Sequence, residues 1–147
     1  MATDPDAAGP NVDRTGIEVL GFDECRELLA TTSIGRVAFQ VAGDIDILPV
    51  NYVMVGHLIT IRTAIGEKLG AAVMNEALAF EIDHYDLSSR TGWSVLAKGT
   101  GREAPDEDIE RLERTGLEPW AGTESRDRWI QIVPHELTGR RIRYRDD

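Results

Sequence analysis

The chain has 147 residues, of which 41% are hydrophobic and 29% are charged. This composition is typical of one globular domain with its own core and is too apolar for a disordered chain. The formal net charge of −10 disfavours nucleic acid or an anionic membrane surface as partner, because neutralising phosphate groups needs a cationic face.

The first residues are rich in Asp, Pro and Gly, so we predict a disordered tail over residues 1–15 and a single domain over residues 16–147. The start lacks the basic stretch and apolar run of a signal peptide, and no run is long enough to span a membrane. Cys25 is the only cysteine and is expected to be buried, which leaves no intrachain disulfide. We therefore expect a cytoplasmic protein.

The first predicted element is a short helix. Asp23 is a plausible N-cap, and Cys25, Leu28 and Leu29 follow the i, i+3, i+4 spacing of one buried helical face. The helix is expected to end near Thr31.

Three strands are predicted next, with Gly-containing turns between them. The β-rich segments are Ile34–Val41, Ile45–Val55 and Leu58–Arg62, separated by turns at residues 43–44 and 56–57. A three-stranded antiparallel meander is the simplest arrangement.

The middle of the chain adds a helix and two strands. The spacing of apolar residues predicts a helix over Ala64–Asn75, then strands over Ala77–Asp83 and Trp93–Glu103. Gly99 and Gly101 in the second strand indicate a bulge or bend where a barrel turns a corner.

The last part is predicted to hold a surface helix that opens at Pro105 and two strands, Arg128–Val133 and Glu136–Tyr144. About six strands with short inserted helices and no βαβ alternation favour a small, mostly antiparallel barrel. Trp120 and Trp129 are expected at a subunit interface.

One candidate anion site follows the third strand of the meander. Arg62 and Thr63 end that strand, Gly66 permits a turn, and Lys68 lies early in the next predicted helix. A phosphate would find a guanidinium, a hydroxyl, an ammonium and free helix N-terminal amides there. On these residues alone, solvated surface charge stays open as the alternative.

Six short motifs in order carry a family resemblance. They are G-R-V-A-F at residues 35–39, P-V-N-Y at 49–52, R-T-x-x-G-x-K-L at 62–69, A-F-E-I-D at 79–83, G-W-S-V at 92–95 and T-G-R-R-I at 138–142. From Phe22 to Ile142 the chain resembles the pyridoxamine 5′-phosphate oxidase-like, FMN-binding split-barrel family, and within it the small actinobacterial-type members.

The resemblance implies a mostly β, six-stranded antiparallel split β-barrel with short flanking helices. It also implies a homodimer that holds FMN in two clefts between the subunits. The phosphate ligands would be Arg62, Thr63 and Lys68. The backbone of Pro49, Val50 and Asn51 would lie along the isoalloxazine ring, and Trp93 and Ser94 would reach the ring or ribityl side.

The implied function is an FMN-dependent oxidoreductase acting on a small organic substrate. True pyridoxamine phosphate oxidases share an Arg-Leu-His-Asp-Arg-type segment, whereas this chain has Trp120–Trp129 instead, so that substrate is not expected. The alternative is a non-catalytic carrier or sensor of flavin, heme or a deazaflavin. Catalytic residues stay unknown.

No metal site is expected. Asp83–Asp86 contains His84 and two carboxylates, but successive side chains of a strand point to opposite faces, which separates the candidate ligands.

Overall fold

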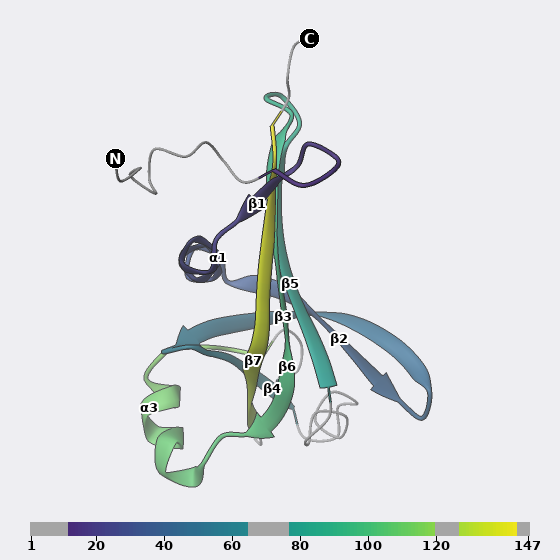
Figure 1. Cartoon of the computed structure of the whole chain (residues 1–147). Coiled ribbons are helices and arrows are strands. Elements are labelled where there is room, and N and C mark those ends of the chain that lie inside the picture. Colours follow the sequence, from purple (N-terminus) through teal and green to yellow (C-terminus); the bar gives the residue numbers. More distant parts are fainter. Residues whose placement is uncertain (1–11, 65–76, 120–126, 144–147) are drawn as a thin grey trace, which may run out of the picture.

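The computed structural model describes residues 12–64, 77–119 and 127–143, and the chain is built mainly from antiparallel strands (Figure 1). The strands are β1 (Glu18–Leu20), β2 (Ile34–Val41), β3 (Asp44–Val55), β4 (Leu58–Ala64), β5 (Ala77–Asp86), β6 (Thr91–Glu103) and β7 (Asp127–Ile142). The helices are α1 (Phe22–Leu29), the 3-10 turn η2 (Asp106–Asp108) and α3 (Ile109–Glu113).

Six of the strands close into a ring. Their order is β7-β4-β3-β2-β5-β6, and β6 pairs back onto β7, while β1 adds to the far half of β7. This ring confirms the predicted six-stranded antiparallel split barrel. The meander of β2, β3 and β4 is also confirmed, and its turns contain Gly43 and Gly56 at positive φ, which glycine adopts without strain.

Three long strands give the molecule its shape. β5, β6 and β7 run side by side as a tall ribbon, and β2, β3 and β4 curl around its lower part (Figure 1). Helix α1 lies on one side of the ribbon, and α3 lies beside its lower end.

The predicted break between the last two strands is wrong, because β7 runs without interruption from Asp127 to Ile142. The register of β6 and β7 shifts between Lys98 and Gly99, opposite Pro134, and this bulge accommodates a residue that cannot donate a ladder hydrogen bond. The bulge predicted from the glycines is thus confirmed at Gly99.

Helix α1 begins one residue before the predicted N-cap. Gly21 occupies the N-cap position without a side-chain cap, and Asp23 lies inside the first turn, where its charge favours the helix dipole. Cys25 is fully buried, and a Cβ placed on Gly139 of β7 would lie 2.6 Å from its sulfur. The missing side chain at Gly139 therefore lets α1 pack closely on the sheet.

The main core fills the barrel and the space under α1. Phe80, Ile82 and Ile130 are among its fully buried side chains, and the Tyr52 ring meets Phe80 edge-on at 4.8 Å. The Tyr52 hydroxyl donates to the carbonyl oxygen of Leu29 at 2.6 Å, which ties β3 to the end of α1.

A second, smaller core lies under α3. It contains Ala104, Leu112, Leu117 and Trp129. Trp129, which we expected at a subunit interface, is 3% exposed and packs inside its own chain instead. Trp120 and the helix predicted to end at Asn75 lie outside the described residues, apart from Ala64, which ends β4.

No helix within residues 12–64, 77–119 and 127–143 is long and apolar enough to cross a membrane.

Candidate functional site

Arg62 is the best-organised cation of the predicted site. It lies on β4 opposite Trp129 of β7, and its guanidinium carbon sits 4.9 Å from the centre of the Trp129 ring. Its Nη1 donates to the carbonyl oxygen of Leu117 at 3.0 Å. Cation–π stacking and this hydrogen bond together hold the guanidinium in one place at the outer surface of the barrel.

The segment after α3 is also held from β3. Asn51 donates from Nδ2 to the carbonyl oxygen of Glu118 at 3.2 Å, one residue beyond the oxygen that Arg62 holds. Two predicted site residues therefore fix the same short segment against the barrel.

Neighbouring site residues face opposite sides of the barrel wall. Val50 and Thr63 are 6% and 7% exposed, so their side chains point inward, whereas Pro49 is exposed and Arg62 is half-buried. Val50 can thus offer only its backbone to an outer ligand. Lys68 lies outside the described residues.

Trp93 and Ser94 lie elsewhere, on β6. Trp93 packs against the main core, and its ring centre lies 6.4 Å from that of His84. Ser94 points to the other face of the ribbon, between its pairing partners Asp83 and Arg140.

One chain does not bring these two groups together. In the strand register, Arg62 of β4 lies opposite Trp129 of β7. Trp93 of β6 lies opposite Arg141, which is twelve residues further along β7. Twelve residues of strand extend about 40 Å, which is longer than an FMN molecule. Figure 1 shows β7 rising from the level of β4 to the top of the ribbon, so the two groups lie at different levels of the molecule.

Sequence reasoning missed a buried polar chain beside Arg62. Arg102 donates from Nε and Nη2 to Oε1 of Gln131 at 3.2 and 3.0 Å, and the Gln131 amide reaches the Thr60 hydroxyl at 3.5 Å. Gln131 and Thr60 are fully buried. The only signal in the sequence was a Gln within an otherwise apolar run of β7, and it does not reveal the partner strands.

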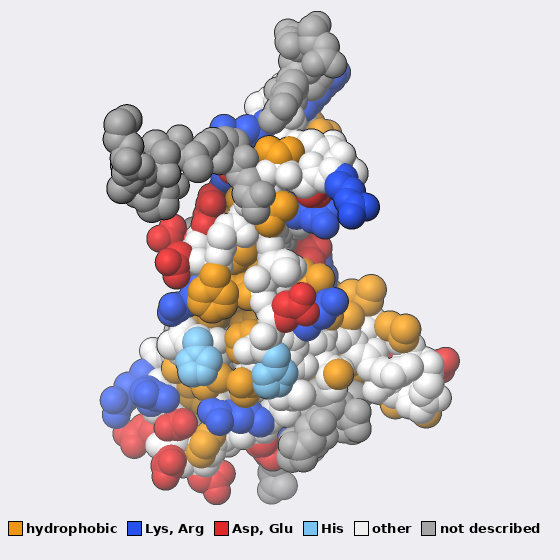
Figure 2. All heavy atoms as spheres, viewed as in Figure 1, with side chains coloured by type: hydrophobic (Ala, Val, Ile, Leu, Met, Phe, Trp, Pro, Cys, Tyr) orange, Lys and Arg blue, Asp and Glu red, His pale blue; other side chains and the backbone are white. Residues whose placement is uncertain are grey.

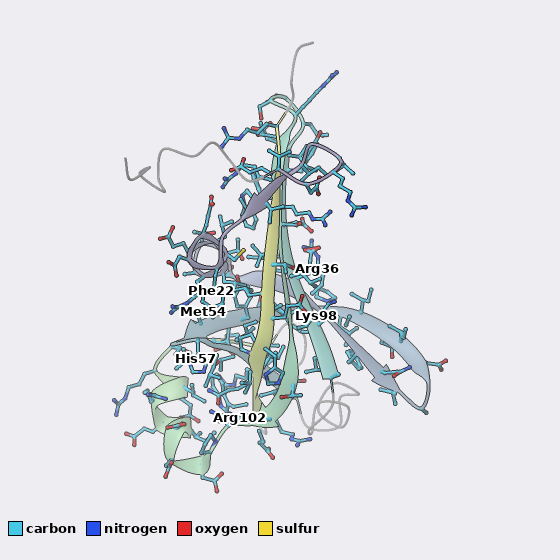
Figure 3. The ribbon with its side chains drawn as sticks, viewed as in Figure 1. Phe22, Arg36, Met54, His57, Lys98 and Arg102 are labelled. Carbon is cyan, nitrogen blue, oxygen red and sulfur yellow. The ribbon has the colours of Figure 1, made fainter. Side chains whose placement is uncertain are left out.

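A cluster of charges lies midway along the ribbon, where Figure 3 labels Arg36. The Arg36 Nη1 atom is 3.3 Å from Oδ2 of Asp83 and 3.7 Å from Oε1 of Glu81. Burial, with the adjacent Asp83 carboxylate, raises the pKa of Glu81 to about 7, and the shared Arg36 only partly opposes this rise. Within the described ranges, no three His, Cys, Asp or Glu side chains group as metal ligands.

A family model described as pyridoxamine 5′-phosphate oxidase matches residues 22–141, and the chain belongs to this family. The match covers β2 to β6 in full and β7 as far as Arg141, so it spans nearly all of the described barrel. The family resemblance inferred from the six motifs is thereby confirmed.

Individual proteins are similar over most of the chain. An uncharacterized protein of Mycobacterium tuberculosis is 37% identical over 141 residues, covering 92% of this chain and 91% of that protein. The solved structure of an FAD binding protein from Mycobacterium smegmatis is 32% identical with a TM-score of 0.72, covering 86% and 98% of the two chains. A conserved Corynebacterium diphtheriae protein of unknown function is 29% identical with a TM-score of 0.69, covering 84% and 96%.

Proposed function

We propose that the protein binds a flavin nucleotide, FMN, and serves as a flavin-dependent oxidoreductase for a small organic substrate. The observation that carries the proposal is Arg62, a guanidinium held on a barrel strand by Trp129 and the Leu117 carbonyl. A pre-positioned guanidinium suits bidentate binding of a phosphate. A similar protein, 32% identical, is an FAD binding protein, which supports a flavin as the ligand class.

In this proposal Arg62, Thr63 and Lys68 hold the phosphate, and the β3 backbone from Pro49 to Asn51 lies along the ring. The outward orientation of Arg62 supports its role directly. Thr63 would take part through its backbone amide, because its side chain points into the barrel. FMN and FAD share the ring and the first phosphate, so this set of contacts fits either nucleotide.

The second half of the site would come from another subunit. Trp93 and Ser94 are too far from Arg62 along β7 to meet the same flavin within one chain. A homodimer would bring the Trp93 and Ser94 of one protomer to the Arg62 of its partner.

An apolar strip on the outer face of β2 and β3 supports such a dimer. Ile34, Ile45 and Ile47 are 44%, 72% and 65% exposed, and Pro49 continues the strip. Figure 2 shows hydrophobic side chains gathered on the hairpin that β2 and β3 form. Exposed apolar patches of this kind usually mark a protein interface.

The bound flavin supplies the electron transfer chemistry itself. The part left to this chain is to bind and orient the nucleotide, to exclude water by subunit contact, and to place backbone amides and Arg62 near developing negative charge. The single cysteine, Cys25, is buried and unpaired with another cysteine, which fits a reducing cytoplasm. Residues 12–15 of the proposed tail are described, and Asp13 among them pairs with Arg140 at 3.5 Å.

A flavin titration tests the proposal. Purified protein is titrated with FMN and with FAD, and binding is followed in the visible absorption spectrum, followed by reduction with NADPH. Arg62→Ala should weaken flavin binding by about 1.5–3 kcal/mol, roughly ten- to a hundred-fold, because a charged hydrogen bond to phosphate is lost. Arg114→Ala is the matched control, since Arg114 lies 72% exposed in a surface pair with Glu110.

Two results would count against this function. If the wild-type protein took up neither flavin at micromolar concentration, a flavin cofactor would be ruled out. Uptake of flavin without reduction by any nicotinamide donor, and without electron transfer to an acceptor, would make the protein a carrier or sensor.

A further inference from the structure

A small cavity lies at the end of the ribbon that is remote from Arg62. It has a volume of about 230 Å³ and lies over the β5–β6 hairpin and the last residues of β7. We call it the Tyr85 pocket, after the aromatic residue in its wall. Its lining includes Tyr85, Gly92, Ser94, Arg140 and Ile142, together with Trp93, which like Ser94 is a residue of the predicted flavin site.

The pocket has a flat aromatic wall. A Cβ on Gly92 would lie 2.6 Å from Cδ2 of Tyr85, so the Tyr85 ring occupies the space beside that glycine. The ring is nevertheless 51% exposed, and Ile142 across the pocket is 47% exposed. An exposed ring beside other apolar groups offers a stacking surface for another ring.

The charges around the pocket are already compensated. Asp83 pairs with Arg36 at 3.3 Å, and Arg140 pairs with Asp13 at 3.5 Å. The pocket therefore gives little preference to an ionic ligand. A ligand with a net charge would gain little from these paired groups and would lose hydration on entering an apolar pocket.

The Ser94 hydroxyl in the pocket wall can orient a ligand. Among the described residues the Ser94 hydroxyl makes no hydrogen bond, although the side chain is half-buried. A hydroxyl can donate to one ligand oxygen and accept from another group.

The volume sets the size of the ligand. An engineered apolar cavity of about 150 Å³ holds one benzene, and pockets for drug-sized ligands begin at roughly 300 Å³. The observed volume lies between these values and fits a substituted single ring or two fused rings.

We propose that the Tyr85 pocket binds an uncharged aromatic molecule of one or two rings, with an oxygen that accepts a hydrogen bond from Ser94. Binding at the pocket is inferred from the geometry of the pocket alone. That this molecule is also the substrate of the flavin rests on the proposed function, in which Ser94 borders the flavin.

The binding test uses 1-tetralone, an uncharged two-ring ketone that is inert to flavin chemistry. It is titrated into flavin-free protein by calorimetry and saturation-transfer NMR, with a Kd of about 0.1–1 mM expected for so small a ligand. 1-Naphthoate, which has two rings and a negative charge, should bind at least tenfold more weakly.

Two variants locate the binding. Tyr85→Ala should weaken 1-tetralone binding about tenfold, because the stacking wall is lost. Ile142→Ala provides a second test of the same wall if the first variant does not fold. Leu87→Ala is the matched control, since Leu87 is 82% exposed in the turn next to β5 and does not line the pocket.

The outcomes separate this proposal from the proposed function. Absence of saturable binding, or 1-tetralone binding by both wall variants that is as tight as that of the wild-type protein, would overturn the Tyr85 pocket, even if flavin binds normally. The protein could instead bind 1-tetralone saturably, with weaker binding by Tyr85→Ala, and take up no flavin. That result would support the pocket and rule out flavin binding.

Discussion

Glu81 is a carboxyl group whose environment makes stability depend on pH. Its pKa is raised to about 7 by burial and by the neighbouring Asp83, against an ordinary value of 4.5. Between pH 4.5 and 7 the unfolded chain releases this proton while the folded chain keeps it. The group therefore destabilises the fold progressively as pH rises through this window, and the penalty is constant above it.

Glu81→Gln should remove that penalty. We expect the Tm of the variant to exceed the wild-type Tm by roughly 2 °C at pH 8, a modest shift because the side chain is partly exposed, and to match it at pH 4.5. Differential scanning calorimetry at the two pH values measures this. Glu113→Gln on α3, whose side chain is exposed, is the control and should show the same small change at both pH values. A Glu81→Gln effect independent of pH would contradict the explanation.

At the same scale, sequence reasoning identified residue types better than their surroundings. Arg62 stood out because a cation ends a predicted strand just before a predicted helix. Its contacts with Trp129 and Leu117 could not be foreseen, because they join positions 55 or more residues apart. The inward direction of Thr63 follows from strand alternation once the burial of Ile61 is known.

At the scale of elements, the bulge between β6 and β7 decides whether the ribbon is continuous. A Cβ on Gly99 would lie 2.0 Å from the Val133 carbonyl oxygen and 2.9 Å from Cα of Pro134. These neighbours are backbone atoms and cannot rotate away. β6 and β7 approach so closely here that only a glycine fits at position 99.

Gly99→Ala should destabilise the protein by about 3 kcal/mol, since the two strands would have to separate locally. Chemical denaturation measures the change in the free energy of unfolding. Gly21→Ala is the matched control, because Gly21 has an ordinary φ of −74° and no atom within 4 Å of the added carbon. Equal stability of the two variants would show that the bulge tolerates a side chain.

The elements also show where local patterns mislead. Pro134 suggested a strand boundary, since proline interrupts the hydrogen-bond ladder in a central strand. The register shift in β6 absorbs it, and β6 lies more than thirty residues away in sequence. Patterns within β2, β3 and β4 were sufficient because each strand there pairs with its neighbour through a short turn.

At the scale of the whole molecule, the barrel separates the two halves of the candidate site. Antiparallel short-range pairing and the ordered motifs were enough to predict the six-stranded ring. The position of Trp93 relative to Arg62 depends instead on how far β6 and β7 extend beyond the ring, which no local pattern reports. In the proposed function, a flavin bridges these halves across two subunits.

A mixed dimer tests that claim most directly. Protomers carrying Arg62→Ala and protomers carrying Ser94→Trp are co-expressed with different affinity tags, and the mixed species is purified and titrated with FMN. If the two residues come from different subunits, one of the two sites receives both substitutions and the other receives neither. We expect half of the wild-type flavin content, bound with wild-type affinity, while each variant homodimer stays nearly empty. A mixed dimer that binds flavin as weakly as the two homodimers would contradict it, because Arg62 and Ser94 would then serve the same site from one chain.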